Sequence, residues 1–305
     1  ISSEEMELLP VEDLSSVVNM QAGIVAGHFR GGRSDEVSYM IDGIPVNDAY
    51  GGVAAVSTLE VESVKDLEVI TGTFNAEYGN AMSGVVNAVT KDGSNEFHGS
   101  VNSAYSTYIT DNKRNGEKVY IGLDPFGINS NSDFRFNLSG PIIKDRLYFF
   151  SNFRTQGING HLNGIRRFNV WNLSNFYDQD SSKWYSENTG DSAFVPMNKG
   201  NYSSLMGKVS LDLGNIRLSW MLNNNYSQSR GYSHVYKYNP DGRSYSDANT
   251  SLMMVQLNHF LNEKMFYDIK YSITDNNYGS YVFEDYDSYE VIKEDGIYQG
   301  VYRFE

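Results

Sequence analysis

The residue types that usually carry enzyme chemistry form no catalytic arrangement in this sequence. It contains no cysteine, which excludes disulfides and thiolate metal sites. Its five histidines lack the spacing of zinc ligands. Neither a Gly-x-Ser-x-Gly nucleophile motif nor a GxxxxGK[ST] phosphate-binding loop occurs. We therefore expect no catalytic residue, no metal and no cofactor, and we predict that the protein is not an enzyme.

Two acidic stretches come nearest to a cation site. Asn239-Pro240-Asp241-Gly242-Arg243 is a fragment of a calcium-loop pattern, without its spacing or its closing Glu. A second patch near the end of the sequence could bind Ca²⁺ loosely, and we favour the interpretation that it is a solvated loop. Its members are Glu284, Asp285, Asp287 and Glu290.

The composition indicates β-structure. The sequence holds 23 Tyr, 16 Phe and 3 Trp, together 14% of its residues, and only 6 Pro. Aromatic residues favour strands, and transmembrane barrels place them in girdles at the membrane surfaces. No apolar run approaches the roughly 18 residues of a transmembrane helix. The formal charge of −14 excludes nucleic acid as an expected partner, because phosphate binding needs clustered Lys and Arg.

The pattern changes near residue 95. Residues 1–92 have the mixed periodicity and the many glycines of a compact α/β unit. The predicted helices are 11–18 and 57–64, and the predicted strands are 37–41, 67–70 and 85–89.

From residue 97 to the end of the sequence at 305, segments of alternating polarity replace this pattern. The clearest is 203–213, which places Leu205, Val209 and Leu211 on one face and Lys208 on the other. About seven strands are expected: 97–108, 133–141, 146–156, 203–213, 216–226, 250–261 and 265–274. Most approach the length at which a tilted strand crosses a bilayer. Aromatic residues just past one turn are candidates for a girdle: Tyr148, Phe149, Phe150 and Phe153.

The connections between these strands alternate between short and long. Short turns near 143–146, 214–215 and 262–264 alternate with long polar links. An outer-membrane barrel has this asymmetry, because one rim carries tight turns and the other carries large loops. A secreted soluble β-protein with long loops, such as a sandwich adhesin, is the alternative.

Four motifs resemble the TonB-dependent receptors of the bacterial outer membrane. Arg30-Gly31-Gly32 followed by Val37-Ser38-Tyr39-Met40-Ile41-Asp42-Gly43-Ile44-Pro45 is similar to the receptors' plug domain, as are 64–72 and 75–91. Residues 138–150 resemble the second and third barrel strands of large Bacteroidetes-type and Oar-like or SusC-like receptors. The resemblance implies an α+β plug over 1–92 and antiparallel transmembrane barrel strands over 97–305.

Family barrels have about 22 strands, so this chain is expected to hold an incomplete barrel. A plug of roughly 90 residues does not fit inside seven or eight strands, whose interior is filled by their own side chains. Seven strands would also leave two open edges, which are costly in lipid. We expect further strands of the same protein to complete the wall.

The resemblance implies roles for particular plug residues. Arg30 and Arg33 are candidates for ion pairs with inward carboxylates of the barrel, and a solvated turn is the alternative for both. The residues read as serving backbone geometry are Gly31, Gly32, Asp42 and Gly43.

Substrate contact is expected after the Asp42–Pro45 turn, in a loop that faces the extracellular vestibule in the family. The candidates there are Asn47, Asp48 and Tyr50. The Asn- and Tyr-rich stretches 223–226 and 232–238 could bind sugars or peptides, although a polar barrel rim is the favoured interpretation.

The resemblance implies an outer-membrane importer surrounded by lipid. TonB, energised through ExbB and ExbD, would pull on the plug and admit an unidentified substrate. A surface lipoprotein lid is left open as a further partner. The alternative function is a plug-barrel receptor or assembly component that binds a protein partner without transport.

Overall fold

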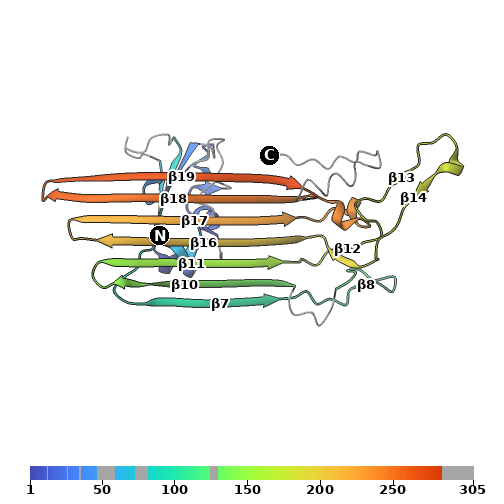
Figure 1. The fold of residues 1–305 in the computed structure, drawn as a ribbon, viewed down its shortest axis with the longest axis horizontal. Helices are drawn as coiled ribbons and strands as arrows, with labels where there is room; N and C mark the ends of the chain where they lie inside the picture. Colours follow the sequence, from blue (N-terminus) through green and yellow to red (C-terminus); the bar gives the residue numbers. More distant parts are fainter. Residues whose placement is uncertain are drawn as a thin grey trace.

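The computed structural model describes residues 1–11, 13–25, 27–33, 36–46, 59–72, 82–123 and 130–283. These residues form a small mixed unit and a large antiparallel sheet that lies beside it (Figure 1). Over the described ranges, no helix has the length and apolar character needed to cross a bilayer.

The small unit is built on a four-stranded sheet in the order β4-β3-β6-β5. Its strands are β3 (Val37–Ile41), β4 (Ile44–Pro45), β5 (Val64–Thr71) and β6 (Gly84–Thr90). The two central strands, β3 and β6, run parallel and both outer pairs are antiparallel. A two-stranded ribbon, β1 (Ile24–Val25) with β2 (His28–Phe29), accompanies the sheet.

Short capped helices precede this sheet. In α1 (Ser3–Glu7), Ser2 and Glu5 form a capping box, while in α2 (Leu14–Asn19) the Asp13 side chain accepts from Ser16 N. The prediction of a helix over 11–18 is confirmed in α2, which begins later because Asp13 caps it. The helix expected over 57–64 is reduced, within the described residues, to the 3-10 turn η3 (Val61–Ser63), after which β5 begins at Val64.

The large sheet contains seven strands in chain order, each antiparallel to its neighbours. They are β7 (His98–Ser106), β10 (Asn131–Ile143), β11 (Leu147–Ile158), β16 (Lys199–Asp212), β17 (Ile216–Arg230), β18 (Tyr245–Asn262) and β19 (Met265–Tyr281). All seven predicted strands are therefore confirmed. Several strands are longer than the segment of alternating polarity that predicted them. For example, β17 has 15 residues, which is roughly 50 Å of chain.

All short turns lie at one end of the large sheet and all long links at the other (Figure 1). The tight turns use residues that tolerate a left-handed backbone, with Asp145 at φ 62° and Gly214 at φ 85°. The long links carry small hairpins and turns of their own. These are β8 (Lys113–Arg114) with β9 (Glu117–Lys118), β12 (Asn163–Ile165) with β15 (Phe194–Pro196), β13 (Ser174–Asn175) with β14 (Tyr185–Ser186), η4 (Ser181–Lys183), η5 (His234–Tyr236) and η6 (Pro240–Gly242).

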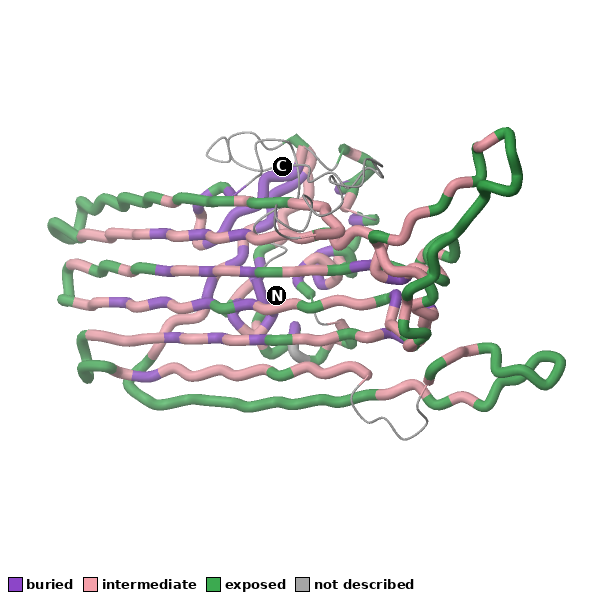
Figure 2. Tube along the Cα trace, turned by 45° about the vertical axis from the view of Figure 1, so that its right-hand side comes forward, coloured by how far each residue is buried: buried purple, intermediate pink, exposed green. Residues whose placement is uncertain are grey.

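The two faces of the large sheet differ in what they contact. Along the middle strands, buried positions alternate with more exposed ones (Figure 2). The exposed positions of the sheet include large apolar residues such as Leu218, Trp220 and Ile269. On β17 the outward residues change from Leu218, Trp220 and Leu222 to the polar Asn224. This pattern fits an apolar band that a bilayer would cover, with the strand ends projecting beyond it.

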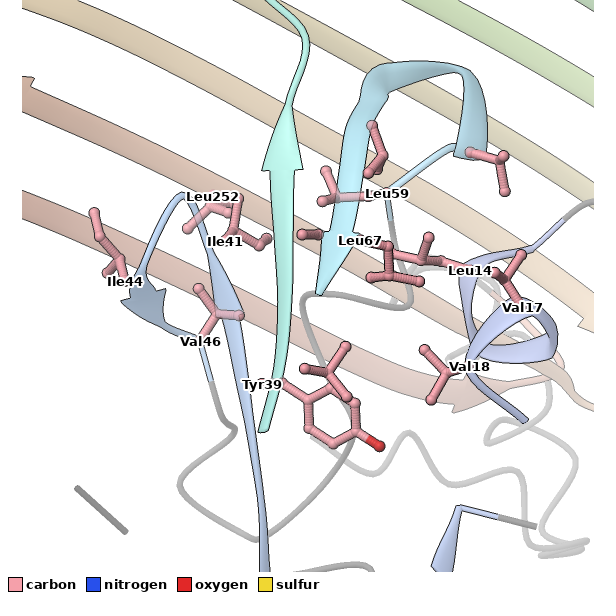
Figure 3. Close-up of a cluster of buried hydrophobic side chains, with 14 of the residues drawn as sticks. Leu14, Val17, Val18, Tyr39, Ile41, Ile44, Val46, Leu59, Leu67 and Leu252 are labelled. Atoms are coloured by element: carbon pink, nitrogen blue, oxygen red, sulfur yellow. The ribbon is translucent and has the colours of Figure 1, made fainter. Parts of the chain in front are cut away.

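Apolar side chains join the small unit to the large sheet in one core. Leu67 and Ile41 of the small sheet share this cluster with Leu252 of β18 (Figure 3). The large sheet also contributes Phe150, Met206, Met221 and Met254. Phe150 was expected in an outer girdle. That interpretation is wrong, because Phe150 alternates inward on β11 and packs into the core.

Over the described residues the large sheet is open, with β7 and β19 as its two edge strands, and every residue of β7 is exposed. The prediction of an incomplete barrel is thereby confirmed for this chain. The small unit lies on the inner face of the wall that these strands form.

Leu67 of β5 provides a test of this core, because its side chain is fully buried in the apolar cluster. Leu67→Ala should lower the free energy of unfolding by about 2–5 kcal/mol, since it removes buried contacts and leaves a cavity. Leu8→Ala is the matched control, because Leu8 is 86% exposed. Denaturant unfolding of full-length protein in detergent measures both. Equal effects of the two changes would contradict the assigned core.

Candidate functional site

The candidate functional site is the contact region between the small unit and the wall formed by the large sheet, which we call the seam. Two polar networks cross this seam. The Glu60 network consists of Glu60, Glu62, Asp133, Arg135, Arg154 and Tyr202. The Asp42 network consists of Asp42, Thr90, Asp92, Lys208, Ser210 and Arg217.

Arg154 of β11 is the centre of the Glu60 network. Its Nη1 lies 3.1 Å from Glu60 Oε2 in the small unit, and its Nη2 lies 2.7 Å from Asp133 Oδ2 on β10. The side chains of Arg154 and Glu60 are only 8% and 6% exposed. Desolvating both charges is costly, so the pair persists because each group has charged and hydrogen-bonding partners.

A second arginine and a tyrosine complete this network. Arg135 Nη2 lies 2.8 Å from Asp133 Oδ2, and its Nη1 lies 3.3 Å from Glu62 Oε1. Tyr202 of β16 donates its hydroxyl hydrogen to Glu60 Oε1 at 2.7 Å. Burial raises the pKa of the Glu60 carboxyl, while the hydrogen bond from Tyr202 and the charge of Arg154 oppose that increase. Each of these two glutamates of the small unit thus meets a cation of the wall.

The Asp42 network begins at the turn between β3 and β4. Asp42 has φ 49° and Gly43 has φ 74°, a left-handed turn that Asp and Gly tolerate better than other residues. The Asp42 carboxylate accepts from Thr90 N at 2.8 Å and from Thr90 Oγ1 at 2.6 Å. These hydrogen bonds fix the turn against the end of β6.

Lys208 of β16 attaches that turn to the wall. Its Nζ lies 3.2 Å from Asp42 Oδ2, 2.8 Å from Thr90 Oγ1 and 3.3 Å from Asp92 Oδ1. Arg217 of β17 reaches Asp92 Oδ2 at 2.9 Å. Since the Lys208 side chain is only 7% exposed, its charge depends on these partners.

A polar recess of about 390 Å³ adjoins this network, between the small unit and strands β16 to β19. Asp42, Gly43 and Lys65 contribute to its lining from one side, and Lys208, Arg217 and Lys270 from the other. Lys270 Nζ donates to the Asp42 carbonyl at 2.9 Å. The recess lies in the half of the wall nearer the short turns.

The arginines predicted to form ion pairs lie elsewhere. Arg30 and Arg33 are both exposed at the turn after β2. Among the described residues, no carboxylate forms a salt bridge with Arg30, whose guanidinium lies against Gly72, where an added Cβ would meet Nη1 at 2.9 Å. The ion pairs seen across the seam have the opposite polarity to the expected one: the small unit supplies carboxylates and the wall supplies cations.

The residues assigned to backbone geometry occupy constrained positions. Gly31 has φ 81°, and Gly32 approaches Ser83 so closely that an added Cβ would lie 2.5 Å from Ser83 Cβ. Asp42 adopts the turn geometry and also binds Thr90 and Lys208 through its carboxylate. The sequence did not suggest that Asp42 would attach the turn to the wall. The substrate-contact candidates Asn47, Asp48 and Tyr50 lie outside the described residues.

The loop motifs have structural partners of their own. Asp241, in the calcium-loop fragment, lies in η6 and accepts from Arg166 Nε at 2.6 Å. Residues 223–226 lie within β17 and not in a loop, and Asn223 and Asn225 are buried on its inner face. Over the described ranges, no group of three His, Asp or Glu side chains is placed to hold a metal, while the patch at 284–290 lies outside those ranges.

An α/β unit tethered by its carboxylates to the inner face of an up-and-down β-wall has the architecture of a plug inside a barrel. Residues 1–85 match the family described as "TonB-dependent Receptor Plug Domain". Residues 1–85 are thus a plug domain of the TonB-dependent receptor type, and the chain resembles these receptors, which are proteins of the bacterial outer membrane. The small unit is accordingly the plug, and the large sheet is part of the barrel wall.

Sequence relatives carry the same family name. The TonB-dependent transporter Oar of Myxococcus xanthus is 42% identical over 125 residues, which are 40% of this chain and 12% of that protein. The probable TonB-dependent siderophore receptor PirA of Acinetobacter baumannii is 31% identical over 175 residues, 49% of this chain and 21% of that protein. The chain therefore spans a minor part of the length of these relatives.

Solved structures share the fold. The siderophore receptor PirA from Pseudomonas aeruginosa matches 92% of this chain and 41% of its own, with a TM-score of 0.57 and 17% identity. The alcaligin receptor FauA from Bordetella pertussis matches 92% of this chain and 39% of its own, with a TM-score of 0.58 and 14% identity. These likenesses concern the fold alone.

Lys208 allows a test of the plug–wall attachment. Lys208→Met should destabilise the docked plug by about 2–3 kcal/mol, because it removes hydrogen bonds between charged groups at a buried site. Lys264→Met, at the exposed turn before β19, is the control. Urea-dependent proteolysis of the plug in full-length protein reports the difference. Identical protease resistance in both variants would show that Lys208 does not hold the plug.

Glu60 gives a pH dependence whose sign follows from burial. A carboxyl whose folded pKa is raised above the ordinary value of about 4.3 contributes stability below that value and loses it as pH rises through the folded pKa. The unfolding free energy of wild type, relative to Glu60→Gln, should therefore fall as pH rises above the ordinary glutamate pKa of about 4.3. Urea titrations at several pH values measure this difference. A difference that is constant with pH would refute the assignment.

Proposed function

We propose that this protein imports a substrate across the outer membrane, with energy transmitted by TonB. The observation that carries the proposal is the way the plug is attached to the wall. Its apolar contacts are supplemented by ion pairs and hydrogen bonds at two separate networks. Ion pairs of this kind can fix the plug in one position on the wall. When a force acts on the plug, the paired groups can exchange their partners for water, so the pairs can serve as a register or a switch.

Import requires that the plug change position or shape, because it lies where a substrate would have to pass. We propose that tension applied by TonB to the plug breaks the Asp42 network first. Asp92 and Arg217 are partly exposed, and their pairing is therefore open to competition by water. The Glu60 network, with Arg154 and Glu60 almost fully buried, would hold the remainder of the plug in register.

The candidate roles given by the family resemblance belong to this proposal. Asn47, Asp48 and Tyr50 would contact substrate at the outer face of the plug. Arg30 and Arg33 would pair with carboxylates of further barrel strands. ExbB and ExbD would energise TonB, and a surface lipoprotein lid is left open.

The relatives do not define one substrate. One is named a probable siderophore receptor, and another, from Vibrio vulnificus, a vitamin B12 transporter that is 33% identical over 102 residues. That protein matches 30% of this chain and 17% of its own length. The shared region thus occurs in receptors for different cargoes. The cargo of this protein therefore has to be identified by testing a panel of candidate substrates.

Uptake by cells tests the proposal directly. Full-length protein should accumulate one member of a labelled panel of ferric siderophores, cobalamin, oligosaccharides and peptides, and accumulation should stop in a strain that lacks TonB. For that cargo, the triple variant Asn47→Ala, Asp48→Ala, Tyr50→Ala should bind more weakly.

The control is a variant with the exposed loop change Lys118→Ala, which should import normally. Uptake that persists without TonB would overturn the proposal. Saturable binding of a protein partner with no accumulation of any panel member would instead support the non-transporting receptor.

A further inference from the structure

The recess beside the Asp42 network concentrates positive charge in an acidic chain. The sequence has 24 Lys and Arg against 38 Asp and Glu, yet four of those cations line this one recess: Lys65, Lys208, Arg217 and Lys270. The carboxylates in the lining are Asp42 and Asp92. A local excess of cations in an acidic protein creates a field that favours anions.

The two carboxylates are already occupied by two of the cations. Lys208 binds both Asp42 and Asp92, and Arg217 binds Asp92. Among the described residues, Lys65 and Lys270 form no salt bridge with either of these two carboxylates. Within the described residues Lys65 forms no salt bridge, and Lys270 lies 3.2 Å from Asp268 while it donates to the Asp42 carbonyl.

The surroundings of Lys65 and Lys270 suit a hydrogen-bonded oxyanion. Neutral donors complete the lining from β17 and β18, in Ser219, Gln256 and Asn258. The recess is about 390 Å³, which is enough for a small carboxylate or phosphate group with water. The ammonium groups are partly exposed, so an incoming anion would not have to displace a buried ion pair.

We infer that this recess is an oxyanion-binding site between plug and wall, with Lys65 and Lys270 as its principal ligands. A carboxylate or phosphate group binds there while the Lys208 and Arg217 pairs keep the Asp42 turn in place. If the protein imports as proposed above, the site lies on the path between plug and wall and favours anionic cargo. The preference for anionic cargo rests on the proposed function, whereas the binding site itself does not.

Citrate is a suitable probe because it carries three carboxylates. Full-length protein in detergent should bind citrate in isothermal titration, and Lys65→Gln with Lys270→Gln should weaken that binding by about tenfold. Raising the ionic strength should weaken wild-type binding as well. The matched control is Lys118→Gln with Lys264→Gln, which removes two exposed lysines outside the recess and should bind citrate as wild type does.

Two results would overturn the inference: no citrate binding by wild type, or equal affinity in wild type and the Lys65/Lys270 variant. Thermal unfolding of each variant separates loss of the site from loss of the fold. The outcome is also separable from the import proposal. TonB-dependent uptake without citrate binding would refute only the oxyanion-binding site. Citrate binding without uptake would refute only the import proposal.

Discussion

The structure depends on the pairing of charges that the plug and wall bury between them. Arg154, Glu60 and Lys208 lose most of their hydration when the two parts meet. Each would be strongly unfavourable in isolation, so the plug has to dock in the one register that supplies every partner. The apolar cluster around Leu67 and Leu252 adds affinity, but apolar contacts tolerate small shifts better than hydrogen-bonded charges do.

This requirement explains how the wall serves two environments. Alternation along β16 sends Leu205 and Val209 outward, and it sends Met206 and Lys208 inward. The same strand thereby offers an apolar surface to lipid and a mixed apolar and charged surface to the plug. A shift of one residue would exchange the two faces, which would bury Leu205 against the plug and place Lys208 in the membrane.

The two networks also divide the seam into regions with different physical properties. Around Glu60 the charged groups are almost fully buried, and Arg154 has more than one partner. This arrangement resists separation of the plug from the wall. Around Asp42 the network borders the polar recess, and the side chains of Asp92 and Arg217 are partly exposed. A plug that is firmly held at one place and more readily released at another can move as a hinged body. That property would suit the TonB-energised import proposed above.

Much of the architecture was determined by the sequence itself. Period-two alternation located all seven wall strands, and the Asp42-Gly43 pair located the plug turn, because local polarity and backbone preference act over a few residues. The alternation along 203–213 likewise placed Lys208 on the face opposite Leu205 and Val209. Which charges meet across the seam was decided only by the tertiary structure. Glu60 and Arg154 are 94 residues apart in the chain, and nothing local to either one records the other. The sequence therefore pointed to Arg30 as an ion-pair residue, whereas in the described part of the chain the docked register pairs plug carboxylates with wall cations.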